Sequence, residues 1–344
     1  MADEGQLTTA GSVAQPLLRA EALTRHFHVG GMFSKETLHA VDNVDLTINE
    51  REIVALVGES GSGKSTIARL LARIYKPTSG EIYYRGRPLR ELHSRKDVLW
   101  YRGEVGMVFQ DPFSAFNPVH RMSHGIMRSL ALHRPELRGS ERRTEAERVS
   151  ESVGLSKRLL SRFPYEMSGG ERQRIGFAQA LALGPKLILA DEPVSMLDVS
   201  IRAGILNLMV ELRDREDVSL LYITHDLASA RYVADRIVVM YAGQIAEAGP
   251  TESVLSNPQH PYTRLLLSAV ADPREADPEF AADTGEPPRV INPGEGCRFR
   301  WRCPFAVDAC HTITPRPRPI GSSAVACHVA GEPATAVAAQ AESG

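Results

Sequence analysis

The stretch that decides the fold is Glu52-Ile-Val-Ala-Leu-Val57 followed by Gly58-Glu-Ser-Gly-Ser-Gly-Lys-Ser-Thr66. The apolar run at residues 53–57 is typical of a strand buried inside a parallel sheet. The following stretch fits the phosphate-binding pattern G-x-x-x-x-G-K-[ST], and a helical pattern continues over residues 67–73. A strand, a glycine-rich loop and a helix in this order predict the core of a nucleoside triphosphatase.

The residue types of this loop suit phosphate chemistry. Glycines let backbone N–H groups curl around phosphate oxygens, and the N-terminus of the next helix adds positive potential. Lys64 can reach the outer phosphates, and the Ser65 hydroxyl is a ligand for Mg²⁺. The alternative is a glycine-rich turn that binds nothing, which the strand before and the helix after disfavour. The predicted nucleotide-binding residues are Gly58, Glu59, Ser60, Gly61, Ser62, Gly63, Lys64, Ser65 and Thr66.

Strand and helix patterns alternate over residues 17–255, as in an α/β domain. Apolar runs at 186–190, 220–224 and 236–240 predict three more buried strands. Residues 111–182 are rich in charge and lack strand patterns, so we expect an inserted helical subdomain there, with residues 141–148 as a solvated helix face. The proline-rich residues 256–330 predict a C-terminal extension, and residues 1–16 and 331–344 predict flexible ends.

The composition excludes several classes of protein. The 344 residues include 40 basic and 42 acidic side chains, a net charge of −2, whereas dedicated nucleic-acid binders usually show a basic excess. No apolar run approaches the roughly 18–20 residues that cross a bilayer. The N-terminal residues also lack the basic-then-apolar pattern of a signal peptide. We therefore expect a cytoplasmic chain with no membrane span of its own and no nucleic-acid partner.

Further segments narrow the class of triphosphatase. They are Tyr165-Glu-Met-Ser-Gly-Gly-Glu-Arg-Gln-Arg174, Leu187-Ile-Leu-Ala-Asp-Glu-Pro193, Ser195-Met-Leu-Asp198, Gln110 and His225. In this order they resemble the signature motif, Walker B strand, D-loop, Q-loop and switch histidine of ABC ATPases. The resemblance covers about residues 17–328. It implies an α/β fold with a P-loop NTPase (RecA-like) core, an antiparallel β subdomain, an inserted α-helical subdomain and a small Cys-containing C-terminal extension.

The resemblance implies ATP as the substrate and a role for each matched residue of the chain's own site. Asp191 would hold the shell of the Mg²⁺ ion, together with Ser65 and Gln110. Glu192 would polarise the attacking water, and His225 and Gln110 would position the reacting groups. The implied catalytic residues are therefore Glu192, His225 and Gln110.

Four other matched residues are expected to bind ATP without being part of the catalytic or Mg²⁺-binding group. In the family, the motif that Ser168, Gly169 and Gly170 resemble forms an N–H cradle for the γ-phosphate held by the opposite subunit, so that ATP joins two ATPase domains. Phe27 lies where the family places an aromatic ring against adenine, although a lone Phe is more often a core residue. All four residues are included among the predicted ATP-binding residues.

The signature motif departs from the family pattern L-S-G-G-Q at two positions. Met167 replaces Leu and preserves apolar volume. Glu171 replaces Gln and places an acid near the partner's nucleotide, where the nearby Arg172 and Arg174 would offset its charge. A subunit with degenerate catalysis is a rival hypothesis, which the intact Glu192 and His225 disfavour.

Three stretches are similar to ATPases that serve peptide importers. They are residues 110–118, residues 260–270 and the Cys-bearing residues 296–328, and the long first hairpin at 28–38 is similar to the second ATPase of dipeptide and oligopeptide systems. This resemblance implies a peripheral subunit on the cytoplasmic face of the membrane. Its partners would be a sister ABC ATPase, two transmembrane permease subunits and an extracytoplasmic substrate-binding protein. Nickel and glutathione importers share the subfamily, so the cargo stays open.

A nucleic-acid machine is the rival class, because some ABC ATPases act without a membrane partner in DNA repair or translation. Those proteins usually carry two ATPase domains in tandem or a long coiled coil. This chain has one P-loop, no heptad repeat and no basic stripe. The transport hypothesis is therefore preferred.

The cysteines are confined to the C-terminal extension. A local cluster in a cytosolic chain predicts a metal site rather than disulfides. The spacings lack the C-x₂-C knuckle of structural zinc sites, and the Cys-Pro at 303–304 is similar to iron–sulfur ligands. A structural [4Fe–4S] cluster is the leading hypothesis. The alternatives are free thiols and a Zn²⁺ site, for which His311 and His328 are possible further ligands. The expected ligands are Cys297, Cys303, Cys310 and Cys327.

Overall fold

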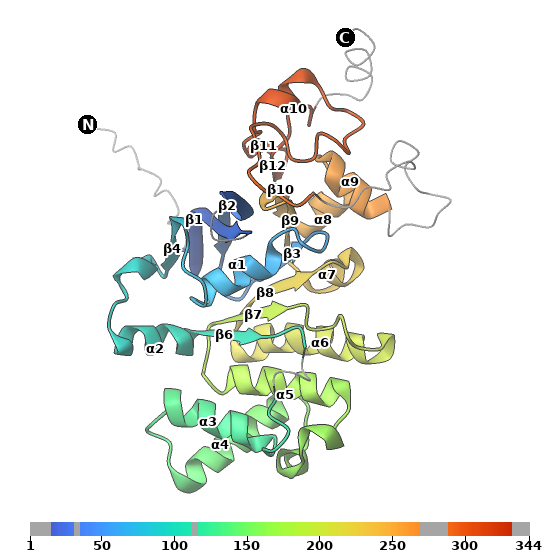
Figure 1. Cartoon of the computed structure of the whole chain (residues 1–344). Helices are drawn as coiled ribbons and strands as arrows, with labels where there is room; N and C mark the ends of the chain where they lie inside the picture. The colour runs from blue at the N-terminus through green and yellow to red at the C-terminus, as the bar shows by residue number, and fades with distance from the viewer. Residues whose placement is uncertain (1–14, 31–34, 112–115, 269–287, 332–344) are drawn as a thin grey trace, which may run out of the picture.

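The computed structural model describes residues 15–30, 35–111, 116–268 and 288–331, which form two sheets with helices packed around them (Figure 1). The strands are β1 (Leu18–Val29), β2 (Glu36–Ile48), β3 (Ile53–Val57), β4 (Ser79–Tyr84), β5 (Arg87–Pro88), β6 (Val105–Val108), β7 (Leu187–Asp191), β8 (Ser219–Thr224), β9 (Arg236–Tyr241), β10 (Gln244–Pro250), β11 (Arg318–Ile320) and β12 (Ser323–Val325). The helices are α1 (Lys64–Leu71), α2 (Arg95–Glu104), α3 (Ser123–His133), α4 (Gly139–Ser152), α5 (Gly169–Leu181), α6 (Val199–Glu216), α7 (Leu227–Val233), α8 (Thr251–Ser256), α9 (Pro261–Ser268) and α10 (Asp308–Thr312).

The larger sheet has the strand order β11-β12-β10-β9-β3-β8-β7-β6. Strands β9, β3, β8, β7 and β6 run parallel, and β10, β12 and β11 extend the sheet in antiparallel fashion. The four runs expected to be strands are β3, β7, β8 and β9, which confirms the predicted α/β core. The sequence pattern does not predict β6, because only four residues form it and Gly106 is one of them.

Strand β3 separates two hydrophobic cores. Ile53, Ala55 and Val57 lie in the core shared with α5 and α6, whereas Val54 and Leu56 lie in the core shared with α1 and the smaller sheet. Successive side chains of a strand point to opposite faces, so a strand covered on both faces is apolar at every position. This is why the run at 53–57 shows no polar alternation.

The smaller sheet is antiparallel and has the order β2-β1-β4-β5. Leu18, Leu23 and Val44 from this sheet are fully buried and pack in one core with Leu56 of β3 and Ile67 of α1. The antiparallel β subdomain expected from the family resemblance is therefore present. It lies over α1, the helix that follows the phosphate-binding loop.

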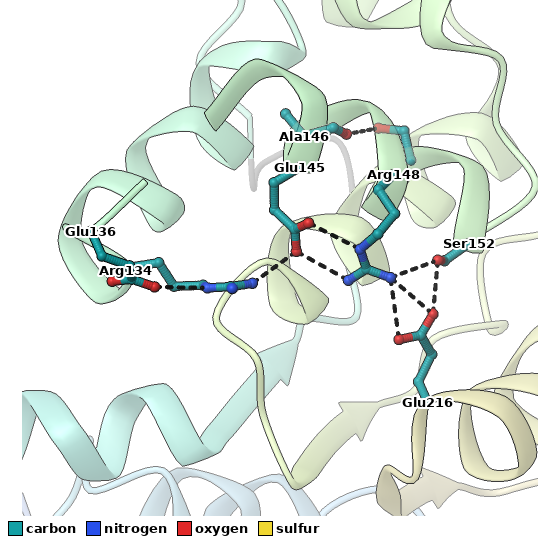
Figure 2. A network of polar contacts seen from close by, with 8 residues as sticks. Arg134, Glu136, Glu145, Ala146, Arg148, Ser152 and Glu216 are labelled. Carbon is teal, nitrogen blue, oxygen red and sulfur yellow. Dashed lines mark hydrogen bonds and ion pairs between the residues drawn. The ribbon is translucent and has the colours of Figure 1, made fainter. Parts of the chain in front are cut away.

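Helices α3, α4 and α5 lie at one end of the molecule, opposite α9, α10 and the strands β11 and β12 (Figure 1). The stretch expected to be helical, 111–182, contains helices and no strand in its described part, residues 111 and 116–182. A polar network connects α4 to α6 of the core (Figure 2): Arg148 Nη1 lies 3.2 Å from Glu216 Oε1, and the Ser152 hydroxyl donates to the same oxygen at 2.8 Å. The helix face at 141–148 is thus solvated only in part, since Arg148 also attaches the helical end to the core.

The C-terminal residues join the large sheet and the small one. Strand β12 pairs with β10, and the backbone N–H of His39 in β2 donates to the carbonyl of Val290 at 2.8 Å. The boundary expected near residue 256 falls at the end of α8. Flexible ends were expected at 1–16 and 331–344, and of these residues the structure describes only Gln15, Pro16 and Gly331. Part of the hairpin expected at 28–38 also lies outside the described residues. In the described part of the chain, no helix has the length and apolar character needed to span a membrane.

His260, just before α9, makes the stability of this region depend on pH. Its side chain is 3% exposed, its Nδ1 accepts a hydrogen bond from the Tyr262 N–H at 3.0 Å, and its ring also bonds to the Ala326 backbone. Burial lowers the pKa of His260 to about 4. An unfolded His has a pKa of about 6.5, so below that pH the unfolded chain binds a proton that the native chain does not.

We therefore expect the contribution of His260 to the free energy of unfolding to fall by about 2 kcal/mol between pH 7 and pH 5. Urea unfolding of the wild type and of His260→Gln at both pH values measures this contribution as the difference between the two pH dependences. Equal pH dependences for the two proteins would contradict the prediction.

Candidate functional site

The phosphate-binding loop connects the end of β3 to the start of α1. Gly58 has a φ of +153° and Gly63 a φ of +105°, both unfavourable for residues with a side chain. A Cβ atom at Gly58 would lie 2.1 Å from the carbonyl oxygen of Met240, and one at Gly63 would lie 2.2 Å from that of Ala40. The loop therefore needs glycine at both positions, because the backbone passes directly against its neighbours.

Lys64 at the start of α1 is held inside this loop. Its side chain is 4% exposed, and its Nζ donates to the carbonyls of Gly58 at 2.7 Å and Glu59 at 2.8 Å. Burial lowers the pKa of Lys64, and the carboxylates of Glu192, Asp191 and Glu59 oppose that shift. The result is a cation placed among the backbone groups of a loop that has the geometry to receive phosphate.

Ser65 and Asp191 bring two oxygen ligands together beside the loop. The Ser65 hydroxyl donates to Asp191 Oδ1 at 2.8 Å, and Asp191 is the last residue of β7 and 3% exposed. Burial raises the pKa of Asp191, and the hydrogen bond from Ser65 opposes that shift. Hydroxyl and carboxylate oxygens are the ligands that Mg²⁺ prefers, so this pair fits the ion that the sequence predicts.

Three neighbouring strands place the predicted catalytic residues at one edge of the sheet. Gln110 follows β6, Glu192 follows β7 and His225 follows β8. Gln110 Nε2 donates to Glu192 Oε2 at 2.9 Å, and His225 Nδ1 lies 3.6 Å from Glu192 Oε1. The carboxyl ends of parallel strands are where α/β proteins bind their ligands.

Glu192 adopts a backbone conformation that a non-glycine residue rarely takes. Its φ is +46°, and its N–H donates to the carbonyl of Ile223 in β8 at 3.0 Å. Such strain costs on the order of 1 kcal/mol and persists only where surrounding contacts impose it. A carboxylate held in this way, with an amide and an imidazole on its two oxygens, is suited to orient and polarise a water molecule.

The signature segment forms the start of α5. Ser168 caps the helix by accepting from the Glu171 N–H at 3.3 Å, and Glu171 Oε2 accepts from the Ser168 N–H at 2.8 Å and hydroxyl at 2.9 Å. Glu171, the departure from the family pattern, thus directs its carboxylate back onto its own helix start. The guanidinium groups of Arg172 and Arg174 donate to backbone carbonyls.

The structure does not bring every predicted site residue together. In the described residues, no hydrogen bond or ion pair joins Ser168, Gly169 or Gly170 to the phosphate-binding loop. Gly170 instead packs on α6, where an added Cβ would lie 2.4 Å from Ile201 Cγ2. Phe27 in β1 contacts Tyr75 edge-on at 5.4 Å, and the guanidinium of Arg25 lies 4.4 Å from the Phe27 ring centroid.

Two residues that contact the phosphate-binding loop were not predicted from the sequence. Tyr262 of α9 and Arg302 of the Cys-bearing segment both bond to Glu59. They lie 203 and 243 residues further along the chain than Glu59, so no local motif connects them to the loop. The loop is therefore covered by the C-terminal extension as well as by its own helix.

The four cysteines are all free thiols. Burial raises the pKa of Cys297 to about 11 and that of Cys303 to about 12, and the other cysteines add to both shifts. No three of the four Sγ atoms lie within 4.8 Å of one another. A tetrahedral zinc site needs S···S separations of about 3.8 Å, so this arrangement does not fit zinc. Four cysteine thiolates are a ligand set that proteins use for both iron–sulfur and zinc centres.

Comparisons with known proteins agree with this geometry. Residues 41–195 match the family model described as ABC transporter, and residues 246–310 match the oligopeptide/dipeptide transporter, C-terminal region. A probable peptide ABC transporter ATP-binding protein of Sinorhizobium fredii is 42% identical over 332 residues, covering 94% of this chain and 93% of that protein. A putative oligopeptide transport ATP-binding protein of Bacillus subtilis is 40% identical over 321 residues, covering 91% and 95%.

A solved structure shows a similar fold. A dimeric ATP-binding cassette in a post-hydrolysis state with bound ADP and Pi superposes with a TM-score of 0.61 at 30% sequence identity. The match covers 68% of this chain and 98% of the cassette.

Proposed function

The chain belongs to the ABC transporter family of ATP-binding proteins, and from this membership we propose that it hydrolyses ATP to power the import of peptides across a membrane. The assignment to transport rests mainly on the match of residues 246–310 to the C-terminal region of oligopeptide and dipeptide transporters. The names of the relatives, which refer to peptide transport, support the same cargo.

In the proposed mechanism, the loop from Gly58 to Thr66 binds the phosphates of ATP through its backbone N–H groups and Lys64. Ser65 and Asp191 would hold Mg²⁺, with Gln110 at the same edge of the sheet. When bound, Mg²⁺ neutralises charge on the phosphate oxygens. The preformed bonds of Lys64 to the loop carbonyls support this assignment, because the amine is already in place before nucleotide arrives.

Glu192 is the proposed general base. Its carboxylate polarises the attacking water, while Gln110 and His225, which contact the two carboxylate oxygens, orient it. The distances of 2.9 Å and 3.6 Å support this assignment, and the longer one is in the range that tightens when substrate binds.

Ser168, Gly169 and Gly170 are proposed to complete the site of a sister ATPase. Their position at the start of α5, without a bond to their own phosphate-binding loop, supports a role in a second subunit. Phe27 is proposed to stack on adenine. Glu171, held in its capping box, would present less charge to the partner's nucleotide than a free carboxylate.

The proposed assembly has two ATPase chains beneath two transmembrane permease subunits, with a substrate-binding protein on the far side. The chain would act peripherally on the cytoplasmic face of the membrane. Selection of cargo would rest with the permeases and the binding protein, while this chain would bind and hydrolyse ATP. Nucleic acid is not a proposed partner.

Uptake by cells tests the cargo. Deletion of the gene should abolish uptake of a radiolabelled tripeptide, and the wild-type gene should restore it, whereas Glu192→Gln should not. Uptake of nickel and of glutathione, measured in the same strains, serves as the comparison. If the deletion strain lost nickel or glutathione uptake but kept normal tripeptide uptake, the cargo would be nickel or glutathione and not peptides. If no uptake changed, a role in import would be contradicted.

We further propose that Cys297, Cys303, Cys310 and Cys327 hold a structural [4Fe–4S] cluster. The presence of four free cysteines within one short segment, three of them buried, supports it. Thiols release protons when they bind metal, and burial raises the pKa of Cys297, Cys303 and Cys327, so loading should weaken as pH falls. Anaerobic purification should yield brown protein with visible absorption and bound iron, and colourless protein loaded with zinc would contradict the proposal.

A further inference from the structure

Glu59, the second residue of the phosphate-binding loop, is held from outside the ATPase core. Arg302 Nη1 donates to Glu59 Oε2 at 2.8 Å and its Nη2 donates to Oε1 at 3.0 Å, a bidentate ion pair. The backbone N–H of Glu59 donates to the Tyr262 hydroxyl at 2.9 Å. Both the side chain and the backbone of this loop residue are therefore bound by the C-terminal extension.

The ion pair is largely removed from water. The Arg302 side chain is 10% exposed and that of Glu59 is 25% exposed. The guanidinium lies 5.7 Å from the ring centroid of Tyr241 and 5.8 Å from that of Phe299. These rings also pack on Tyr262, at 4.5 Å and 5.5 Å between centroids. The planar Arg302 guanidinium lies among aromatic rings and forms two hydrogen bonds with one carboxylate, so it has little freedom to move.

The negative charge of Glu59 can affect phosphate binding because Glu59 lies in the phosphate-binding loop, next to Lys64. Its carboxylate is one of three that oppose the lowering of the Lys64 pKa by burial, and its carbonyl accepts from Lys64 Nζ. An uncompensated carboxylate here would repel the triphosphate and compete with it for Lys64. Arg302 offsets that charge through the bidentate ion pair, so Lys64 faces one fewer uncompensated carboxylate.

We propose that Arg302 and Tyr262 are positioning residues that hold and neutralise Glu59, so that the affinity of the loop for ATP depends on docking of the C-terminal extension. This inference rests on the proposed ATPase function. Arg302 directly precedes Cys303, so a change in the fold of the Cys-bearing segment would reach the ATP site through the Arg302–Glu59 ion pair. By linkage, bound nucleotide stabilises the docked extension to the same degree.

Calorimetric titration of the full-length chain with the magnesium complex of a non-hydrolysable ATP analogue tests the charge argument. We expect Arg302→Ala to raise Kd about tenfold, equal to ~1.4 kcal/mol. The double variant Arg302→Ala/Glu59→Gln should return Kd to within about threefold of the wild type, because the repelling carboxylate is gone. Tyr262→Phe, which keeps the ring and loses only the hydroxyl, should raise Kd about threefold.

Exposed Arg316, in the same extension, provides the matched control: Arg316→Ala should bind like the wild type. Steady-state hydrolysis should show a raised KM for ATP in Arg302→Ala with kcat within about twofold, because Glu192, Gln110 and His225 are untouched. Unchanged affinity in Arg302→Ala would overturn the inference, and so would a double variant as weak as the single one. Failure of the wild type to bind nucleotide would instead contradict the proposed function.

Discussion

Glu192→Gln should lower the rate of ATP hydrolysis by at least ~100-fold and leave nucleotide binding intact. The amide has nearly the size of the carboxylate, so the contacts with Gln110 and His225 and the unusual backbone of Glu192 can persist. What is lost is the negative charge that polarises water. Because hydrolysis would separate the two ATPase subunits, the variant should accumulate as an ATP-bound dimer.

Phosphate release and size-exclusion chromatography with MgATP measure the two effects of Glu192→Gln. The exposed Glu91 offers a matched control, and Glu91→Gln should hydrolyse ATP at the wild-type rate. Turnover at the wild-type rate in Glu192→Gln would remove this residue from the catalytic assignment. A variant that unfolds at a lower temperature than the wild type would point to lost stability, which thermal unfolding without nucleotide detects.

Lys64→Met should weaken binding of MgATP by ~100-fold or more, about 2.7 kcal/mol. The amine is buried and donates to three acceptors in the loop, Gly58 O, Glu59 O and Ser62 Oγ. Methionine keeps the apolar stem and removes the charge-assisted bonds to phosphate. The stability of the free protein should change by only about 1 kcal/mol, because relief of a buried charge offsets the lost bonds.

Thermal unfolding separates these effects of Lys64→Met. Saturating MgATP should raise the unfolding temperature of the wild type and of the exposed control Lys96→Met, since a ligand that binds only the native state stabilises it. It should not raise that of Lys64→Met. An equal rise in all three proteins would contradict the role of Lys64.

The residues proposed for nucleotide binding and catalysis were predictable because each belongs to a short local pattern, and the family resemblance implied their roles. Asp191 and Glu192 follow an apolar strand, and Lys64 and Ser65 follow a glycine-rich loop. The strand patterns at β3, β7, β8 and β9 were equally clear, since strands covered on both faces are continuously apolar. Strand β6 was missed because its four residues include a glycine and fall below the length at which a pattern can be recognised.

Contacts that depend on packing were not predictable in this way. Glu171 was expected near a partner's nucleotide, with its charge offset by Arg172 and Arg174; its carboxylate closes a capping box with Ser168. The Ser-x-x-Glu spacing of that box is present in the sequence, and a helix start read with this rule would have indicated it. Arg148 was expected on a solvated face and also binds Glu216 of α6.

The sequence by itself determined the ATPase core, because phosphate binding and catalysis depend on residues spaced within single strand-to-loop segments. The tertiary structure alone decided what surrounds the phosphate-binding loop. Glu59 meets Tyr262 and Arg302 across 203 and 243 residues, a contact set by the docking of α9 and the Cys-bearing segment against β10 and β2. The spacing of residues within the loop determines which atoms can bind phosphate. The charge around that phosphate also depends on side chains far away in the sequence, such as Arg302, which reach the loop only when the chain is folded.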